Sequence, residues 1–118
     1  MNYSNKELGD WGENRACTYL KDTGYNLVER NFRTRWGEID IIARREDLIA
    51  FIEVKTRKSK KYGTPVEAVN RKKQHKIKSL ARSFLQQNDI TCCQVRFDII
   101  SIKISGCKAR LRHLKNAF

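Results

Sequence analysis

The feature that most constrains the fold is a pair of apolar runs, residues 38–43 and 48–54, separated by a short charged segment. Two such runs joined by a tight turn predict a β-hairpin. With Glu46 and Asp47 as the two-residue turn, one hairpin face is wholly apolar: Ile39, Ile41 and Ala43 lie against Val54, Ile52 and Ala50. A slip of one residue would bring charged side chains onto that face, so we expect this register.

The same register brings charged residues together on the opposite face of the hairpin. It places Asp40 directly opposite Glu53, and Glu38 opposite Lys55. We therefore expect one face to be core, and the other to carry two carboxylates and a lysine at one end. Glu38 could pair with Lys55 or with a nearby arginine.

The segment before the hairpin predicts a helix, a strand and a loop. Ser4 and Glu7 have the spacing of a capping box, and apolar residues follow at helical intervals until Gly24, a plausible stop. Residues 25–30 read as a first strand, and residues 31–37 as a basic loop.

The second half of the chain predicts a helix and two further strands. Thr64 to Glu67 forms a second capping box ahead of a helical pattern that ends near Leu85. Asn70 could instead cap a separate helix that begins at Arg71. Residues 93–100 and 109–114 read as strands, the last a polar edge strand. The order predicts an α/β or α+β sheet of five strands, with helices covering both faces, in a single domain spanning residues 1–118.

Charge indicates the partner. The chain has 25 Lys and Arg against 13 Asp and Glu, a formal net charge of +12. Residues 55–78 carry ten basic side chains and one acidic one, Glu67. Such a surface favours a polyanion, because cationic side chains that neutralise phosphates release counterions. Solvated basic faces are the alternative interpretation.

Apolar runs and cysteines indicate the cellular location and the metal content to expect. No run approaches the roughly 18 apolar residues of a membrane span, and the first residues lack a signal-peptide pattern, so we expect a cytoplasmic protein that does not bind membranes. The four cysteines contain no C-x-x-C pair. We therefore expect buried free thiols and no structural metal site.

Asp98 lies between two apolar residues, Phe97 and Ile99, and is expected to pair with an arginine.

The hairpin carboxylates predict chemistry. Two opposed carboxylates repel each other, and a divalent cation removes the conflict. Mg²⁺ prefers one or two carboxylates together with water and substrate phosphate. Lys55 follows Glu53 by two residues and so shares its face. There it can act on water and steady negative charge on an attacked phosphate, which is what hydrolysis of a phosphodiester requires.

An ordered set of motifs over nearly the whole chain resembles a known family. Asp40 followed by Glu53-Val54-Lys55 is similar to the PD-(D/E)xK signature of restriction-endonuclease-like nucleases. More closely, the chain resembles the bacterial YraN-like uncharacterised protein family. The matching stretches are Gly12-Glu13, Asn31-Phe32-Arg33-Thr34-Arg35, Gly37-Glu38-Ile39-Asp40, Glu53-Val54-Lys55-Thr56-Arg57, Glu67-Ala68-Val69, Lys73, Arg96-Phe97-Asp98 and Asn116-Ala117-Phe118.

The resemblance implies a fold, a site and an activity. It implies a mixed central sheet flanked by helices, close to Holliday-junction resolvases. Asp40 and Glu53 would be ligands of Mg²⁺ or Mn²⁺, Lys55 the catalytic lysine, and Glu13 a first-helix carboxylate near the metal. Glu13 could equally be a helix-surface residue. The superfamily's proline before the aspartate is here Ile39.

Two functional classes remain open at this stage. One is a metal-dependent endonuclease acting on DNA, including branched or single-stranded structures. The other is a noncatalytic nucleic-acid-binding subunit of a repair, recombination or DNA-uptake machine. Either would bind phosphates through basic side chains, and resolvase-like chemistry would suggest a homodimer that cuts paired strands. The expected phosphate contacts are Arg33, Arg35, Arg57 and Lys73.

Overall fold

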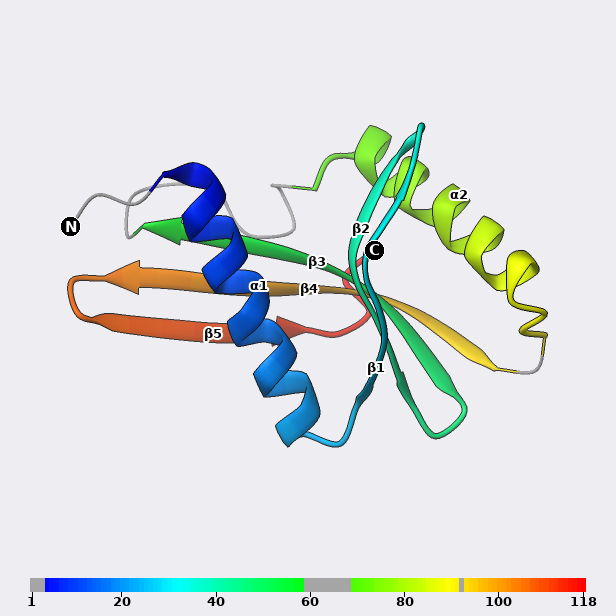
Figure 1. Ribbon diagram of the computed structural model, residues 1–118, viewed down its shortest axis with the longest axis horizontal. Coiled ribbons are helices and arrows are strands. Elements are labelled where there is room, and N and C mark those ends of the chain that lie inside the picture. Colours follow the sequence, from blue (N-terminus) through cyan, green and yellow to red (C-terminus); the bar gives the residue numbers. More distant parts are fainter. Residues whose placement is uncertain (1–3, 59–68, 92) are drawn as a thin grey trace.

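The structure, a computed structural model, contains two helices and five strands (Figure 1). It describes residues 4–58, 69–91 and 93–118. In chain order the elements are α1 (Asn5–Asp22), β1 (Asn26–Thr34), β2 (Gly37–Arg45), β3 (Leu48–Lys58), α2 (Arg71–Gln87), β4 (Gln94–Ser105) and β5 (Lys108–Leu114).

The five strands form one mixed sheet in the order β1-β2-β3-β4-β5. Neighbouring strands are antiparallel except for β3 and β4, which are parallel and are joined through α2. A parallel pair needs such a crossover, whereas the antiparallel pairs are joined by tight turns. The predicted α/β class, with a five-stranded mixed sheet flanked by helices, is confirmed, and the arrangement is consistent with a restriction-endonuclease-like fold.

Each helix covers a different face of the sheet. Residues of α1, including Ala16 and Leu20, form one apolar core with Ile41 and Ile52. Residues of α2 form the other core. In Figure 1, α1 crosses in front of the long strands, and α2 lies beside the β1–β2 hairpin. The central strands are therefore buried on both sides.

The predicted hairpin register is confirmed along the paired residues of β2 and β3. Arg45 lies opposite Leu48 around the turn, and the paired residues end at Ile41 opposite Ile52. Beyond that point the backbone amide of Val54 donates instead to Oδ2 of Asp40, at 2.8 Å. The Asp40 side chain thus takes the place of a backbone partner just beyond the last paired residues of β2 and β3.

Two expectations about the hairpin faces are wrong. Ile39 packs in the α2-side core, whereas Ile41 and Ala43 pack in the α1-side core, so the alternation breaks at Asp40. The face that carries the carboxylates is itself buried elsewhere, because Phe51 of that face packs under α2. β2 is an internal strand covered on both sides, so a one-sided apolar pattern is not required.

The helix starts follow the capping signals. The Ser4 hydroxyl accepts from the Glu7 amide and the Glu7 carboxylate accepts from the Ser4 amide, which confirms the capping box. The separate helix beginning at Arg71 is also confirmed, with the Asn70 side chain accepting from the Lys73 amide. The predicted capping box of Thr64 to Glu67 lies outside the described residues.

The remaining expectations on the backbone and cysteines have mixed outcomes. The predicted basic loop 31–37 is mostly strand, because β1 continues to Thr34 by pairing with β2. The polar last strand lies at a sheet edge, as expected.

The cysteines only partly follow the expectation of buried thiols. Cys17 is a buried free thiol, but Cys107 is exposed in the β4–β5 turn, so the prediction that all the thiols are buried is wrong. No described helix is long and apolar enough to cross a membrane.

Candidate functional site

Asp40, which is half-buried, and Glu53, which is buried, form a pair of carboxyl groups at the point where the β2–β3 pairing stops. Glu53 is only 6% exposed. Burial, a hydrogen bond with Glu53 and the negative charge of Glu53 raise the pKa of Asp40 to about 9. The amide of Val54, which donates to Asp40, opposes this shift. One of the two carboxyl groups therefore keeps a proton at neutral pH when no cation is bound.

Two lysines lie beside this pair on the α2 side of the sheet. Nζ of Lys73, from the first turn of α2, is 3.4 Å from Oε1 of Glu53. Lys55 follows Glu53 by two residues on β3, so it extends from the same face. Burial and a hydrogen bond with Lys73 lower the pKa of Lys55, although the negative charge of Glu53 opposes them. The two carboxyl groups and two lysines thus form one electrostatic cluster.

α1 brings a third carboxylate to the same region. Gly12 allows the approach, because a Cβ at this position would lie 1.8 Å from Oγ1 of Thr56 on β3. The next residue, Glu13, accepts from Arg30 at 3.1 Å and from the side-chain amide of Asn31 at 2.9 Å. Glu13 is therefore held by β1, and its negative charge contributes to the raised pKa of Asp40.

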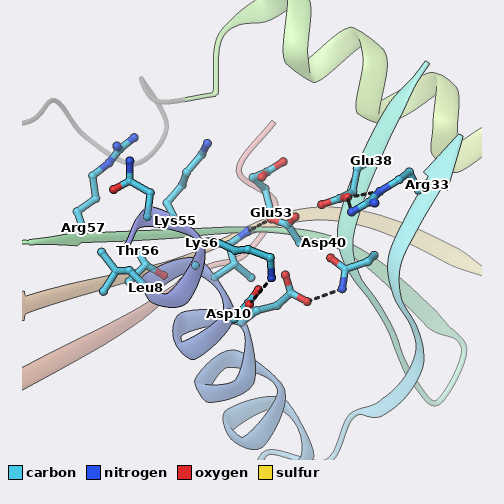
Figure 2. A pocket seen from close by; sticks show the side chains of 15 residues that line it. Lys6, Leu8, Asp10, Arg33, Glu38, Asp40, Glu53, Lys55, Thr56 and Arg57 are labelled. Carbon is cyan, nitrogen blue, oxygen red and sulfur yellow. Dashed lines mark hydrogen bonds and ion pairs between the residues drawn. The ribbon is translucent and has the colours of Figure 1, made fainter. Parts of the chain in front are cut away.

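An open cavity of about 860 Å³ connects these groups. It is lined by α1 and by strands β1, β2 and β3. Figure 2 shows Asp40 beside Glu53 at its centre, with Lys55 and Arg57 extending from β3 to one side. Of the residues predicted from the sequence, the cavity brings together Glu13, Arg33, Asp40, Glu53, Lys55 and Arg57.

Three predicted site residues contact other side chains of the protein, and one of these contacts is the expected pairing of Glu38 with an arginine. Arg33 binds Glu38 across β1 and β2, with Nε 2.7 Å from Oε2, so Glu38 pairs with an arginine rather than with Lys55. Arg35 lies over the ring of Trp36, 4.7 Å from its centroid, and does not line the cavity. Lys73, expected as a phosphate contact, lies against Glu53.

Two contributors were not identified from the sequence. Asn31 adopts a left-handed backbone conformation, with φ of 53°, and its side chain holds Glu13. Asparagine tolerates this conformation better than most residues, which is a weak sequence signal. Arg30 binds Glu13 from the neighbouring position on β1. Both contacts join segments far apart in the chain, so spacing could not reveal them.

The donor set fits a magnesium ion better than a metal held entirely by protein. Among residues 4–58, 69–91 and 93–118, no three His, Cys, Asp or Glu side chains are arranged to hold a metal. Zinc sites usually need three or four protein ligands. Mg²⁺ is commonly held by one or two carboxylates, with water and substrate phosphate as its other ligands. Asp40 and Glu53 meet that requirement.

A second buried carboxylate lies elsewhere in the fold. Arg96 donates to both carboxylate oxygens of Asp98, as expected for a pairing with arginine. His113 Nε2 lies 2.7 Å from Asp98, and the amide of Asn116 donates at 3.0 Å. Tyr19 contacts the other ring nitrogen of His113, at 2.8 Å. The hydrogen bonds from His113, Arg96 and Asn116 outweigh burial and lower the pKa of Asp98.

Known proteins resemble this chain over almost all of its length. A family model described as uncharacterised protein family UPF0102 matches residues 12–102. A UPF0102 protein of Geobacter metallireducens is 48% identical over 119 residues, covering 100% of this chain and 97% of the relative. A UPF0102 protein of Alkaliphilus oremlandii is 47% identical, covering 97% of this chain and 99% of the relative. One of Syntrophomonas wolfei is 42% identical, with coverage of 97% and 99%.

Proposed function

We propose, on the premise that this chain belongs to the uncharacterised protein family UPF0102, that it is an endonuclease that hydrolyses phosphodiester bonds of DNA with Mg²⁺ or Mn²⁺. The observation that carries the proposal is the pairing of half-buried Asp40 with buried Glu53 beside Lys55. The proposed substrates are duplex, branched or single-stranded DNA.

The carboxyl pair is costly for the folded protein unless a cation binds it. Two carboxylates that share a buried site cannot both ionise at neutral pH without compensation. The pKa of about 9 for Asp40 expresses that cost, because proton retention is the alternative to a bound cation. A divalent ion would release the proton and be held by both groups. Natural sequences retain such arrangements mostly at functional sites.

Each residue then has a distinct task. Asp40 and Glu53 would hold the cation, which when bound supplies Lewis-acid polarisation of the phosphate. Lys55 is placed to donate to a phosphate oxygen and to stabilise the negative charge that develops as water attacks the phosphorus and the P–O bond to the leaving oxygen breaks. Lys73 offsets part of the negative charge of Glu53 before substrate arrives. Glu13, held by Arg30 and Asn31, supports the acidic side of the cavity.

The test is metal-dependent cleavage of a panel of branched, single-stranded and duplex DNA. Asp40→Asn and Glu53→Gln should abolish cleavage, and Lys55→Ala should slow it about 10²–10³-fold, the cost of losing a comparable electrostatic donor. Asp22→Asn and Lys21→Ala, exposed at the far end of α1, are the matched controls and should cleave normally. Gel-shift affinity measured on the same substrates separates binding from chemistry.

Each outcome decides between the two functional classes. Cleavage that survives Asp40→Asn and Glu53→Gln would place the activity in another site or in a contaminant. Tight DNA binding by the wild type, without cleavage under Mg²⁺ or Mn²⁺, would support the noncatalytic binding subunit instead.

A further inference from the structure

The strand register gathers basic side chains on one face of β3, β4 and β5. Lys55 is paired with Ser101, which is paired with Arg112. Two residues further along, Arg57 is paired with Lys103, which is paired with Arg110. Side chains at paired positions of a sheet lie on the same face. We call these five cations the basic sheet face: Lys55, Arg57, Lys103, Arg110 and Arg112.

The basic sheet face continues the surface on which the carboxyl pair lies. The preceding row is Glu53, Ile99 and Leu114, and its two apolar members pack with the α2-side core. The alternate residues Ile102 and Leu111 point to the α1-side core instead. Along the strands the surface therefore changes from an apolar core to cations at the position of Lys55. Lys103, Arg110 and Arg112 are exposed.

Three members of the basic sheet face have no carboxylate partner within the described part of the chain. No described carboxylate forms an ion pair with Lys103, Arg110 or Arg112. Like charges directly opposite on paired strands are destabilising, and Lys103 and Arg110 are such a pair. Protection of an edge strand from aggregation needs only scattered charges, so it does not account for opposed cations on an inner and an edge strand.

The spacing of the cations suits a polyanion. Neighbouring strands lie about 4.8 Å apart and alternate residues about 6.6 Å apart, so the backbone positions of the five residues span about 10 by 7 Å. Duplex DNA carries one negative charge for about every 1.7 Å of its axis, so such a patch can meet several phosphates at once. Lys55 belongs both to this face and to the cavity of the carboxyl pair.

We infer that the basic sheet face binds the phosphate backbone of a duplex arm of DNA that leads to the carboxyl pair. The inference rests on the proposed function for the identity of the polyanion. It adds Lys103, Arg110 and Arg112 to the DNA contacts, which the basic run of residues 55–78 does not include. It also places the bound arm over β3, β4 and β5, on the side where Lys55 and Arg57 extend (Figure 2).

The experiment compares two triple variants that remove the same charge. The test variant is Lys103→Gln, Arg110→Gln and Arg112→Gln together. The control is Arg15→Gln, Lys21→Gln and Arg44→Gln, exposed residues of α1 and of the β2 end nearest the β2–β3 turn. Affinity for a short duplex DNA is measured against salt concentration in metal-free buffer, with circular dichroism to confirm folding of both variants.

The test variant should weaken duplex binding by about two orders of magnitude at low salt and reduce the salt slope by about 2 to 3 units, because each lost phosphate contact removes about 0.9. The control should change the slope by less than one unit. Equal losses in both variants, or wild-type binding by the folded test variant, would overturn the inference. Wild-type cleavage with Mg²⁺ is assayed separately. Binding carried by the basic sheet face without any cleavage would contradict the proposed chemistry and leave this surface assigned.

Discussion

The two buried carboxylate sites of this protein are built in opposite ways. Asp98 is fully buried, receives donors from three residues, and has a lowered pKa. Asp40 is placed against a second carboxyl group, and its pKa is raised to about 9. Both sites contain basic side chains close by. The difference is that the donors around Asp98 match its charge, whereas Asp40 and Glu53 share a charge that the lysines only partly balance.

This contrast separates a structural site from a functional one. A buried charge that is fully paired and hydrogen-bonded contributes to one well-defined fold, and removing its partners leaves an uncompensated charge. Two carboxyl groups held close together repel each other when both are ionised, and a bound cation removes that repulsion. The charge of Asp98 is already balanced by hydrogen bonds from Arg96, His113 and Asn116. The charge of Asp40 and Glu53 is only partly balanced by the protein, and both residues line a cavity that a cation can enter.

The largest expected effect is the loss of stability in Asp98→Asn. The substitution keeps the shape of the side chain but leaves Arg96, which is 18% exposed, without its counter-charge. Breaking a buried pair in this way costs about 3–5 kcal/mol of unfolding free energy. Asp40→Asn should not destabilise the protein at pH 7, because the amide replaces a carboxyl group that is protonated in the folded state but ionised in the unfolded state. Urea unfolding at pH 7 measures both, and equal losses would remove the contrast.

The second prediction is that the two carboxylates give opposite pH dependences of stability. Because the pKa of Asp40 is raised in the folded state, its contribution is present below the unfolded value near 4 and is lost as pH rises towards 9. Because the pKa of Asp98 is lowered, its contribution is present above its unfolded value and is lost as pH falls below it.

Urea unfolding across pH tests this prediction through differences between variants. The stability of Asp40→Asn relative to wild type should increase as pH rises from 5 to 9, while Asp98→Asn should lose its disadvantage as pH falls below about 4. Added Mg²⁺ should reduce the first difference, since the cation replaces the proton. A flat difference for Asp40→Asn would show that this carboxyl group ionises normally in the folded protein.

The sequence supported the hairpin register because a slip would have mixed charged and apolar residues. The same reasoning did not foresee that Ile39 changes face, since the break depends on the Asp40 side chain accepting from Val54 in place of a strand partner. The Asp98 cluster combines residues from α1, β4, β5 and the C-terminal segment, so no local pattern could reveal it beyond its arginine. The register itself predicted Asp40, Glu53 and Lys55 as one site, whereas the place of Glu13 beside them came from the resemblance in motifs.

The third prediction concerns Glu13, which has features of both sites. Its carboxylate accepts hydrogen bonds from Arg30 and Asn31, and its negative charge also contributes to the raised pKa of Asp40. Glu13→Gln should therefore weaken Mg²⁺ binding about tenfold, as loss of a supporting residue near a metal does. Stability should fall by about 1 kcal/mol, the value of one hydrogen-bonded pair. Calorimetric titration with Mg²⁺ checks the first, with Glu29→Gln of β1 as the control; unchanged Mg²⁺ affinity would make Glu13 a purely structural residue.

The smallest expected effect on stability is that of Lys73→Met. Lys73 is 39% exposed on its side chain and lies 3.4 Å from Glu53, so solvent screens the ion pair. Its removal should cost less than about 1 kcal/mol, as for other partly exposed pairs. Lys55, on the same face, remains to balance Glu53. Mg²⁺ affinity should rise, because a positive charge that competes for Glu53 is gone.

Lys72→Met is the matched control for this substitution, since Lys72 is exposed on the same turn of α2 and has no ion pair with a described carboxylate. It should leave both stability and Mg²⁺ affinity unchanged. A loss of several kcal/mol in Lys73→Met would mean that Lys73 matches Glu53 as Arg96 matches Asp98. The carboxyl pair would then be a second structural cluster, because its charge would already be satisfied by the protein and would have no demand for a cation.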